Sequence, residues 1–376
     1  MYTEKRFEET KELLKTLIGI PSVSGSEKEL AEYIVSTLNQ YGVDEVSLQE
    51  VKPERYNVRG TFRGGKPGKT TLLTGHIDVV NAGDGWKTDP FKAVEKDGRI
   101  YGRGSNDMKA GLAVMMQCIK TACENRENYP GNIEIAFLCD EEAYSIGANY
   151  LAKAGVTADF GLSAEPEFNP AIVGAAGKTL IKAYVKGVPS HAAHPQDGVN
   201  AVEDAAKFIC GYSALDNPAH DKIAAQPYVT LRIDGGIKEY SLIVPDNCEI
   251  LINKHTVPGE TRDVVIERLQ NITEEMELKS EFRFSIEEPY YPPYSIDEDN
   301  ENIKVIKQIF SDVTDCTLSL GYGDGVSDNN IIVPQCGIPV ICLGPTGGNM
   351  HAANEWVDIE EIKTVLKIYL KYLFEC

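Results

Sequence analysis

The sequence predicts an α/β protein with a zinc-exopeptidase-like, mostly parallel central sheet flanked by helices, into which a second domain is inserted. Short apolar segments alternate with helical patterns in the first half of the chain and again near its end. This alternation is typical of a parallel sheet that helices cover on both faces. Between residues 177 and 290 the order of the elements changes, and 376 residues are enough for two domains.

Composition excludes several classes of function. The chain is 42% hydrophobic and 25% charged, as expected for a globular protein, and its net charge of −20 argues against nucleic acid or an anionic membrane as a partner. The N-terminus has no secretory pattern, and no apolar run reaches the roughly 18 residues that cross a bilayer, so we expect a cytoplasmic protein. Nine cysteines without a C-x-x-C pair indicate neither disulfides nor a cysteine zinc site.

The first half of the chain contains the predicted strands and helices of the main sheet. Residues 24–42 form a helical pattern, for which Ser26 and Glu29 are a candidate capping box and Gly42 a stop. Each predicted strand ends in, or shortly before, polar residues, and ligands of such sheets bind beyond the carboxyl ends of the strands. The strands are expected at 69–76, 132–140, 159–166 and 337–345, with helices at 108–126 and 145–155.

The inserted segment has the order strand, helix, strand, strand, helix, strand, which is the ferredoxin-like arrangement. We therefore expect a catalytic metal-binding domain of residues 1–176 and 291–376 and a lid and dimerisation domain of residues 177–290. Residues 287–295, rich in proline and tyrosine, are the expected return linker. The elements of the insert are expected at 178–187, 198–215, 227–234, 247–256, 260–276 and 280–288.

Polar residues at the strand ends make up one set of histidines and carboxylates. Each has a structural explanation when taken alone: Asp107 could cap a helix that starts at Met108, for example, and the adjacent glutamates could be a solvated charge run. Together they provide the nitrogen and oxygen ligands that suit zinc and related divalent ions, and one ion would not need so many. The set comprises His76, Asp78, Asp107, Glu141, Glu142, Glu165 and His351.

The motifs H-x-D, G-R-G-x-x-D-M-K-x-G, D-E-E, x-x-E-P and H-x-x-N-E occur in this order along the chain. They resemble the co-catalytic zinc family that includes acetylornithine deacetylase, succinyl-diaminopimelate desuccinylase, aminoacylase and glutamate carboxypeptidase. The resemblance implies two divalent metal ions, Zn²⁺ with Co²⁺ or Mn²⁺ as alternatives, bridged by Asp107. It implies that His76 and Glu165 complete one ion, and that Glu142 and His351 complete the other.

The same resemblance implies roles for residues that bind no metal. Asp78 would orient the imidazole of His76, and Glu141 would be the general base. In the segment 186–202, His191 matches the histidine that stabilises the developing oxyanion in relatives, whereas His194 matches no fixed role and is expected to be structural. In relatives that pair through the lid, this histidine serves the neighbouring subunit, so the resemblance implies a homodimer.

Physical reasoning supports this division of roles. Two ions about 3.5 Å apart need a shared ligand, and a carboxylate at a helix start, such as Asp107, can present both oxygens. A second carboxylate that is not consumed as a ligand can take the proton of the attacking water, so Glu141 and Glu142 can divide the work. Gly102 and Gly104 are expected to form the tight turn that brings Asp107 close.

The substrate clamp departs from the family pattern. Relatives that bind an α-carboxylate often have an arginine where this chain has His255, and an asparagine where it has Leu242. An imidazole is not a bidentate guanidinium, so Lys254 or the loop with Gly347 and Gly348 would take over, or the substrate lacks that carboxylate.

The leading hypothesis is a metal-dependent hydrolase of the amide bond in an N-acyl amino acid or a small peptide. The choice between deacetylase, desuccinylase and di- or tripeptidase stays open. A binuclear phosphoesterase would need more cationic groups than Arg103 and Lys109 near Asp107. An inactive metal- or peptide-binding protein is the third alternative, and the presence of Glu141 argues against it.

Overall fold

The computed structural model describes residues 1–218, 220–224, 226–237, 239 and 241–375, and the chain forms two compact units. The predicted insert, residues 177–290, falls within unit 2. Unit 1 comprises Met1–Val173, Ile296–Gly321 and Ser327–Cys376, and unit 2 comprises Gly174–Ser295 and Tyr322–Val326.

The larger sheet has β6, β3, β7 and β15 as neighbours at its centre, and these strands pair in parallel. These are the apolar segments that the sequence assigned to parallel strands. The pairs β1–β2, β2–β6, β15–β8 and β8–β13 on the flanks are antiparallel, and β14 pairs with β8. The α/β prediction is confirmed, as a mixed sheet with a parallel centre. The strands are β1 (Glu45–Lys52), β2 (Arg55–Arg63), β3 (Lys66–His76), β6 (Pro130–Leu138), β7 (Phe160–Ser163), β8 (Ala171–Ala175), β13 (Tyr294–Ser295), β14 (Leu320–Gly323) and β15 (Val340–Cys342).

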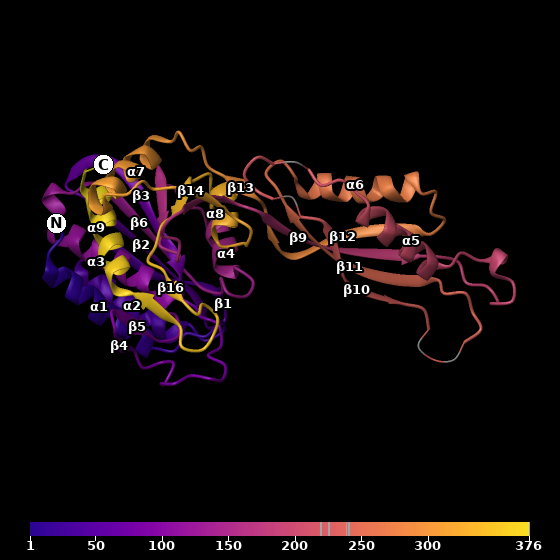
Figure 1. Ribbon diagram of the computed structural model, residues 1–376, viewed down its shortest axis with the longest axis horizontal. Helices are drawn as coiled ribbons and strands as arrows, with labels where there is room; N and C mark the ends of the chain where they lie inside the picture. The colour runs from indigo at the N-terminus through magenta and orange to yellow at the C-terminus, as the bar shows by residue number, and fades with distance from the viewer. Residues whose placement is uncertain (219, 225, 238, 240, 376) are drawn as a thin grey trace. The chain divides into compact units, whose positions relative to one another are not determined.

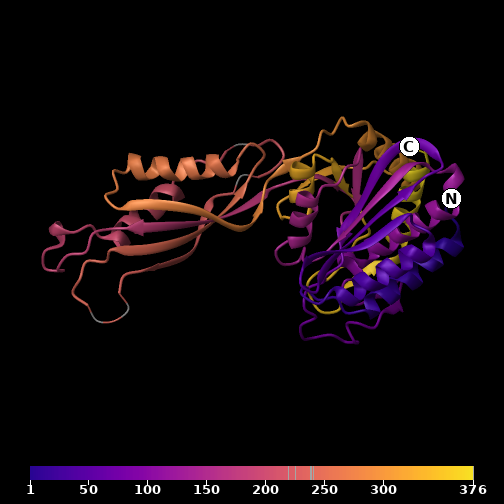
Figure 2. The same ribbon diagram turned by 180° about the vertical axis from the view of Figure 1, so that it is seen from behind.

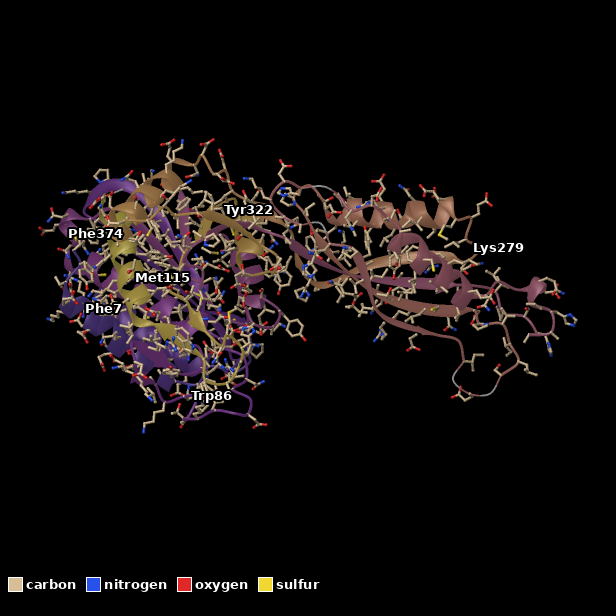
Figure 3. All side chains as sticks on the ribbon, in the orientation of Figure 1. Phe7, Trp86, Met115, Lys279, Tyr322 and Phe374 are labelled. Atoms are coloured by element: carbon tan, nitrogen blue, oxygen red, sulfur yellow. The ribbon has the colours of Figure 1, made fainter. Side chains whose placement is uncertain are left out.

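Helices cover both faces of this sheet. α3 packs against α1, α2 and α9 on one side, and α4 and α8 pack against each other on the other side (Figures 1 and 2). Met115 of α3 is fully buried in the interior of the unit (Figure 3). The helices are α1 (Glu4–Gly19), α2 (Lys28–Tyr41), α3 (Ala110–Glu124), α4 (Ile146–Ala154), α7 (Glu301–Thr314), α8 (Asn329–Cys336) and α9 (Ile359–Glu375), with a short helical turn at Arg126–Asn128.

The predicted capping box of Ser26 and Glu29 is wrong. Helix α2 begins at Lys28, and no side chain caps its first turn. Glu27 occupies the cap position, but its fully buried carboxylate accepts a hydrogen bond from the Gly25 amide (2.9 Å) and pairs with Arg55 of β2. An ion pair with a distant strand therefore replaces the local cap that the sequence pattern indicated.

A small antiparallel sheet in unit 1 determines where two of the predicted ligands meet. Its order is β16 (Gly347–Gly348), β17 (Trp356–Asp358), β5 (Arg99–Tyr101) and β4 (Val94–Lys96). The loop between β16 and β17 carries His351, and the loop after β5 carries Asp107. Because β17 pairs with β5, these two loops lie next to each other.

Unit 2 has the predicted βαββαβ order. Its sheet is antiparallel, in the order β10-β11-β9-β12, and α5 and α6 pack on it. Phe208 of α5 is fully buried in the core between these layers and packs against Tyr212, Phe282 and Phe284. The elements are β9 (Gly177–Lys186), α5 (Ala201–Ser213), β10 (Tyr228–Gly235), β11 (Asn247–Thr256), α6 (Arg262–Glu275) and β12 (Glu281–Tyr291), with a short helical turn at Pro195–Asp197.

Two expectations from composition concern the chain as a whole. Within the described ranges, no helix is long and apolar enough to cross a membrane. The cysteines from Cys118 to Cys342 are free thiols, and Cys376 lies outside the described residues.

Candidate metal centre

His76 ends strand β3 and is almost completely buried. Its Nε2 lies 2.9 Å from Asp107 Oδ1 and 3.6 Å from Glu165 Oε2. Burial lowers the pKa of His76, but the carboxylates of Glu165 and Asp107 outweigh burial and hold this pKa well above its usual value. Nδ1 lies 2.9 Å from the main-chain carbonyl of Asp78, which leaves Nε2 to face the carboxylates.

Asp107 lies between two imidazoles. Its Oδ1 faces His76 Nε2, and its Oδ2 lies 3.2 Å from His351 Nε2. Burial alone would raise the pKa of Asp107, but the hydrogen bonds with His351 and His76 hold it well below the usual range. One carboxylate thus presents each of its oxygens to a different imidazole nitrogen, which is the arrangement that a bridging ligand requires.

The local backbone around Asp107 differs from the predicted helix start. Helix α3 begins at Ala110 rather than Met108, and Asp107 has extended dihedral angles in the turn that precedes it. Gly104 in this turn has a φ of +80°, and a Cβ atom there would lie 2.6 Å from Val79 Cγ1. The turn therefore requires glycine at position 104, as the sequence indicated.

Glu142 and His351 complete the second half of the cluster. His351 Nε2 lies 2.9 Å from Glu142 Oε2, and His351 adopts a left-handed backbone with a φ of +59°. A hydrogen bond with Asp107 raises the pKa of His351 to about 9 against the effect of burial. Burial and the charge of Asp107 raise the pKa of Glu142 to about 7.

The donor set fits a divalent metal. One ligand atom from each of His76, Asp107 and Glu142 lies within 4.8 Å of the others, and Glu165 and His351 adjoin them. Imidazole nitrogen and carboxylate oxygen are ligands that zinc accepts. In the structure, hydrogen bonds hold the imidazole nitrogens and the carboxylate oxygens together. A bound metal ion could take the place of the protons in these hydrogen bonds.

Glu141 adjoins this cluster and is half-buried. Burial raises the pKa of its carboxyl well above the usual value, and the nearby carboxylates of Glu165 and Asp328 raise it further. Glu141 is not among the side chains whose ligand atoms meet in the cluster. A carboxylate with high proton affinity beside a candidate metal cluster is suited to accept a proton.

The carboxylate of Asp78 contacts the turn of Glu141 and Glu142 more closely than it contacts the imidazole of His76. Its Oδ1 lies 3.6 Å from His76 Nδ1, whereas its main-chain carbonyl lies closer and accepts the hydrogen bond of the ring. The carboxylate of Asp78 accepts hydrogen bonds from the amides of Glu141 (3.0 Å) and Glu142 (3.2 Å) and from Ser24 Oγ (2.6 Å). Asp78 thus fixes the backbone of the adjacent glutamates, a contact that sequence reasoning missed.

Glu355 also escaped sequence reasoning, although it is the last residue of the H-x-x-N-E motif. Its buried carboxylate accepts hydrogen bonds from the amides of Gly104, Asn106 and Asp107, at 2.9 to 3.1 Å, and pairs with Arg103 at 2.6 Å. Glu355 therefore ties the loop of His351 to the loop of Asp107. The signal available in the sequence was a carboxylate four residues after a candidate ligand.

The remaining predicted site residues lie in the following places. Gly347 and Gly348 form β16, directly before the His351 loop. In unit 2, His191 is exposed and accepts a hydrogen bond from the Ala193 amide (3.0 Å), while His255 is half-buried on β11. Lys254 is fully buried and contacts Gln226 O, Asn217 Oδ1 and Glu260 Oε2 within the same unit.

Comparison with known proteins places these residues in a family context. The sequence profile of peptidase family M20/M25/M40 matches residues 72–375 of this chain. The chain is 28% identical over 377 residues to succinyl-diaminopimelate desuccinylase of Wolinella succinogenes, with 96% of this chain and 98% of that protein aligned. The desuccinylase of Sulfurimonas denitrificans is also 28% identical, over 382 residues, with 97% and 99% aligned.

Solved structures share the fold. Aminopeptidase PepT from Bacillus cereus has a TM-score of 0.79 at 24% identity, and the alignment covers 98% of each chain. A dinuclear metal-binding peptidase of Bacillus subtilis has a TM-score of 0.75 at 17% identity, with 99% of each chain aligned.

The pKa values of the cluster predict that metal binding releases protons. At pH 7 His351 is protonated because its pKa is about 9, and Glu142 is partly protonated because its pKa is about 7. A metal ion must displace these protons and that of His76, whose pKa is also raised, so the affinity for Co²⁺ should rise with pH by about tenfold per unit for each proton released. The contribution of His351 should end above about pH 9. Calorimetry in buffers of different ionisation enthalpy measures the number of protons.

The matched variant is His351→Ala, which should release about one proton fewer at pH 7. Binding that releases no protons and does not depend on pH between 6.5 and 9 would contradict this assignment of the protons.

Proposed function

This chain belongs to peptidase family M20/M25/M40 and is a metal-dependent hydrolase of amide bonds, and we propose that its substrates are N-acyl amino acids or small peptides. The observation that carries the proposal is the pair Glu141 and Glu142. Glu142 supplies a ligand atom to the group of candidate ligands, whereas the adjacent Glu141 adjoins this group without supplying one. A protein that only bound metal would have no need of this second carboxylate.

We assign two divalent ions to the cluster, Zn²⁺ in the first place and Co²⁺ or Mn²⁺ as alternatives. His76 and Glu165 would hold one ion, and Glu142 and His351 the other. Asp107 would serve both, and this role is supported by the contact of each of its oxygens with a different histidine. When bound, such ions polarise the scissile carbonyl and lower the pKa of a water molecule.

The side chains then have distinct tasks in the reaction. Glu141 takes a proton from the water that attacks the carbonyl carbon, and returns it to the nitrogen of the leaving amine. Asp78 holds the amides of Glu141 and Glu142, so the proton acceptor and the ligand keep a fixed spacing. The amide bond breaks after the tetrahedral addition, and the products are a carboxylic acid and an amine.

A phosphoesterase is the less suitable alternative. The cationic groups near Asp107 that could bind a phosphate are already engaged. Arg103 pairs with Glu355, and Lys109 donates hydrogen bonds to the carbonyls of Leu17 (2.8 Å) and Ile20 (2.9 Å). Burial lowers the pKa of Lys109 to about 7, which makes it a weaker cation still.

The lid residues complete the proposal. We assign oxyanion stabilisation to His191 and contact with a substrate carboxylate to His255. Lys254, Gly347 and Gly348 are the alternatives for that contact, and Lys254 would first have to leave Glu260. We further propose that the protein is a homodimer that pairs through unit 2, and that His191 acts at the partner's metal centre.

A substrate panel tests the function and the clamp together. Enzyme stripped by a chelator should be inactive, and Zn²⁺ or Co²⁺ should restore hydrolysis of N-acetyl or N-succinyl amino acids or of di- and tripeptides. Each N-acyl amino acid is paired with its carboxamide, in wild-type protein and in His255→Ala. Loss of a preference for the carboxylate in this variant would assign the clamp to His255, and an unchanged preference would exclude it. Hydrolysis of phosphate esters alone would overturn the proposal.

Substitution of the adjacent glutamates separates the base from the ligand. Glu141→Gln should lower kcat by roughly 10² to 10⁴ while metal content stays unchanged, because only the proton acceptor is lost. Glu142→Gln should instead lose metal. Equal loss of metal in both variants, measured by elemental analysis, would show that these roles are assigned wrongly.

Complementation tests whether His191 acts across the dimer. His191→Ala and Glu141→Gln are each expected to be nearly inactive, but a mixed dimer would contain one site with both residues intact. Co-expression with different affinity tags isolates the mixed dimer, whose activity should partly return. A purified mixed dimer as inactive as its parents would exclude action between subunits.

A further inference from the structure

Arg55 at the start of β2 joins two buried carboxylates. Its Nε and Nη2 donate to the two oxygens of Glu27 at 2.7 and 2.6 Å, and Nη2 also donates to Asp140 Oδ1 at 2.5 Å. Glu27 is fully buried and Asp140 nearly so. A planar guanidinium can hold one carboxylate with two parallel hydrogen bonds and contact a second one, and a lysine ammonium cannot reproduce this geometry.

Asp140 is the residue directly before Glu141 and Glu142. It has a left-handed backbone with a φ of +72°, and its carbonyl accepts hydrogen bonds from the amides of Tyr144 (3.1 Å) and Ser145 (2.6 Å). The whole turn therefore closes on Asp140. A change in the orientation of Asp140 would move both glutamates, because they lie inside this turn.

Other contacts hold the same turn at different points. Asn57, also on β2, accepts a hydrogen bond from the Cys139 amide (3.1 Å) and donates one to the Gly147 carbonyl (3.0 Å), so it fixes the ends of the turn. Asp78 holds the amides of the two glutamates. Arg55 thus holds the side chain of Asp140, the residue at which the backbone of the turn is left-handed.

The segment before helix α2 connects these contacts. Ser24 donates a hydrogen bond to Asp78, and Glu27, three residues later, binds Arg55. The Glu27 carboxylate also accepts a hydrogen bond from the Gly25 amide, which fixes Glu27 relative to the segment before α2. One short segment therefore supports the turn of the glutamates from two sides, through Asp78 and through Arg55.

We propose that Arg55, held by Glu27, is a positioning residue that acts through Asp140 to keep Glu141 and Glu142 in their working orientation. The catalytic part of this inference rests on the proposed function, whereas its effect on metal binding through Glu142 does not. If Arg55 only tied helix α2 to the sheet, its substitution would lower the stability and leave kcat and the affinity for metal unchanged.

The test compares Arg55→Lys with Arg126→Lys in the full-length protein. Arg126 is a matched control in unit 1, because it binds both oxygens of Asp44 (2.9 and 2.8 Å) and the carbonyls of Gly42 and Arg63, away from the cluster. Arg55→Lys should lower kcat by about 10- to 100-fold and keep KM within about threefold of the wild-type value. It should also weaken, at least about tenfold, the binding of the Co²⁺ ion that is assigned to Glu142 and His351. Arg126→Lys should change the melting temperature only.

Each outcome decides the proposal. If Arg55→Lys resembles Arg126→Lys, with kcat and the affinity for Co²⁺ unchanged, the positioning role is wrong. If Arg55→Lys does not fold, Glu27→Gln decides by the same two measurements, because it removes the charge that holds Arg55 and leaves Asp140 intact. If the wild-type protein hydrolyses no amide, but Arg55→Lys still binds Co²⁺ more weakly than the wild type, the proposed function is wrong and the positioning role of Arg55 stands.

Discussion

The buried carboxylate of Asp107 is the group on which the candidate centre depends. It contacts His76 and His351 at once, and Glu355 holds its amide. Burying several carboxylates together is costly unless cations or hydrogen bonds compensate their charge. In the structure, the imidazoles compensate part of this charge, as the raised pKa of His351 and the lowered pKa of Asp107 indicate. A divalent ion would compensate this charge more completely, because it would carry two positive charges into the same buried site.

Buried arginine–glutamate pairs support the turns that carry the cluster. Arg103 with Glu355 fixes the turn of Asp107, and Arg55 with Glu27 fixes the turn of the adjacent glutamates through Asp140. Such pairs contribute little net stability, because desolvation offsets most of the attraction, but removing one partner leaves an uncompensated charge. Their value here is geometric, since each pair joins segments that are far apart in the sequence. Turns with left-handed residues, such as Asp140 and His351, need this external support.

The fold was predictable from the sequence, and so was the proximity of His76, Asp107 and Glu142, because apolar and polar residues follow local patterns. Apolar segments that end in polar residues identified the parallel strands, whose carboxyl ends meet at one edge of the sheet. Asp107 and His351, by contrast, are brought together by the pairing of β17 with β5. The contacts of Asp78 and Glu355 were not predictable in the same way, because their partners are backbone amides whose positions depend on the folded turns. Glu27 was not predictable for the same reason. The pattern of Ser26 and Glu29 indicated a local cap at the start of α2, but Glu27 occupies the cap position and its partner is Arg55 on strand β2.

Unit 2 illustrates how stability and function can be separated within one chain. The core around Phe208 is formed mostly by residues of the unit's own helices and strands, whereas the exposed loop residues 191–197 take no part in it. His191 lies in such an exposed loop, whereas Lys254 is buried under Tyr228 and bound to groups of the same unit. Among the residues proposed to contact substrate, those already engaged in the core of a unit are therefore the least free to change partners. The half-buried His255 is therefore better suited to this contact than its neighbour Lys254, because a carboxylate contact with His255 would not require Lys254 to leave its buried partners.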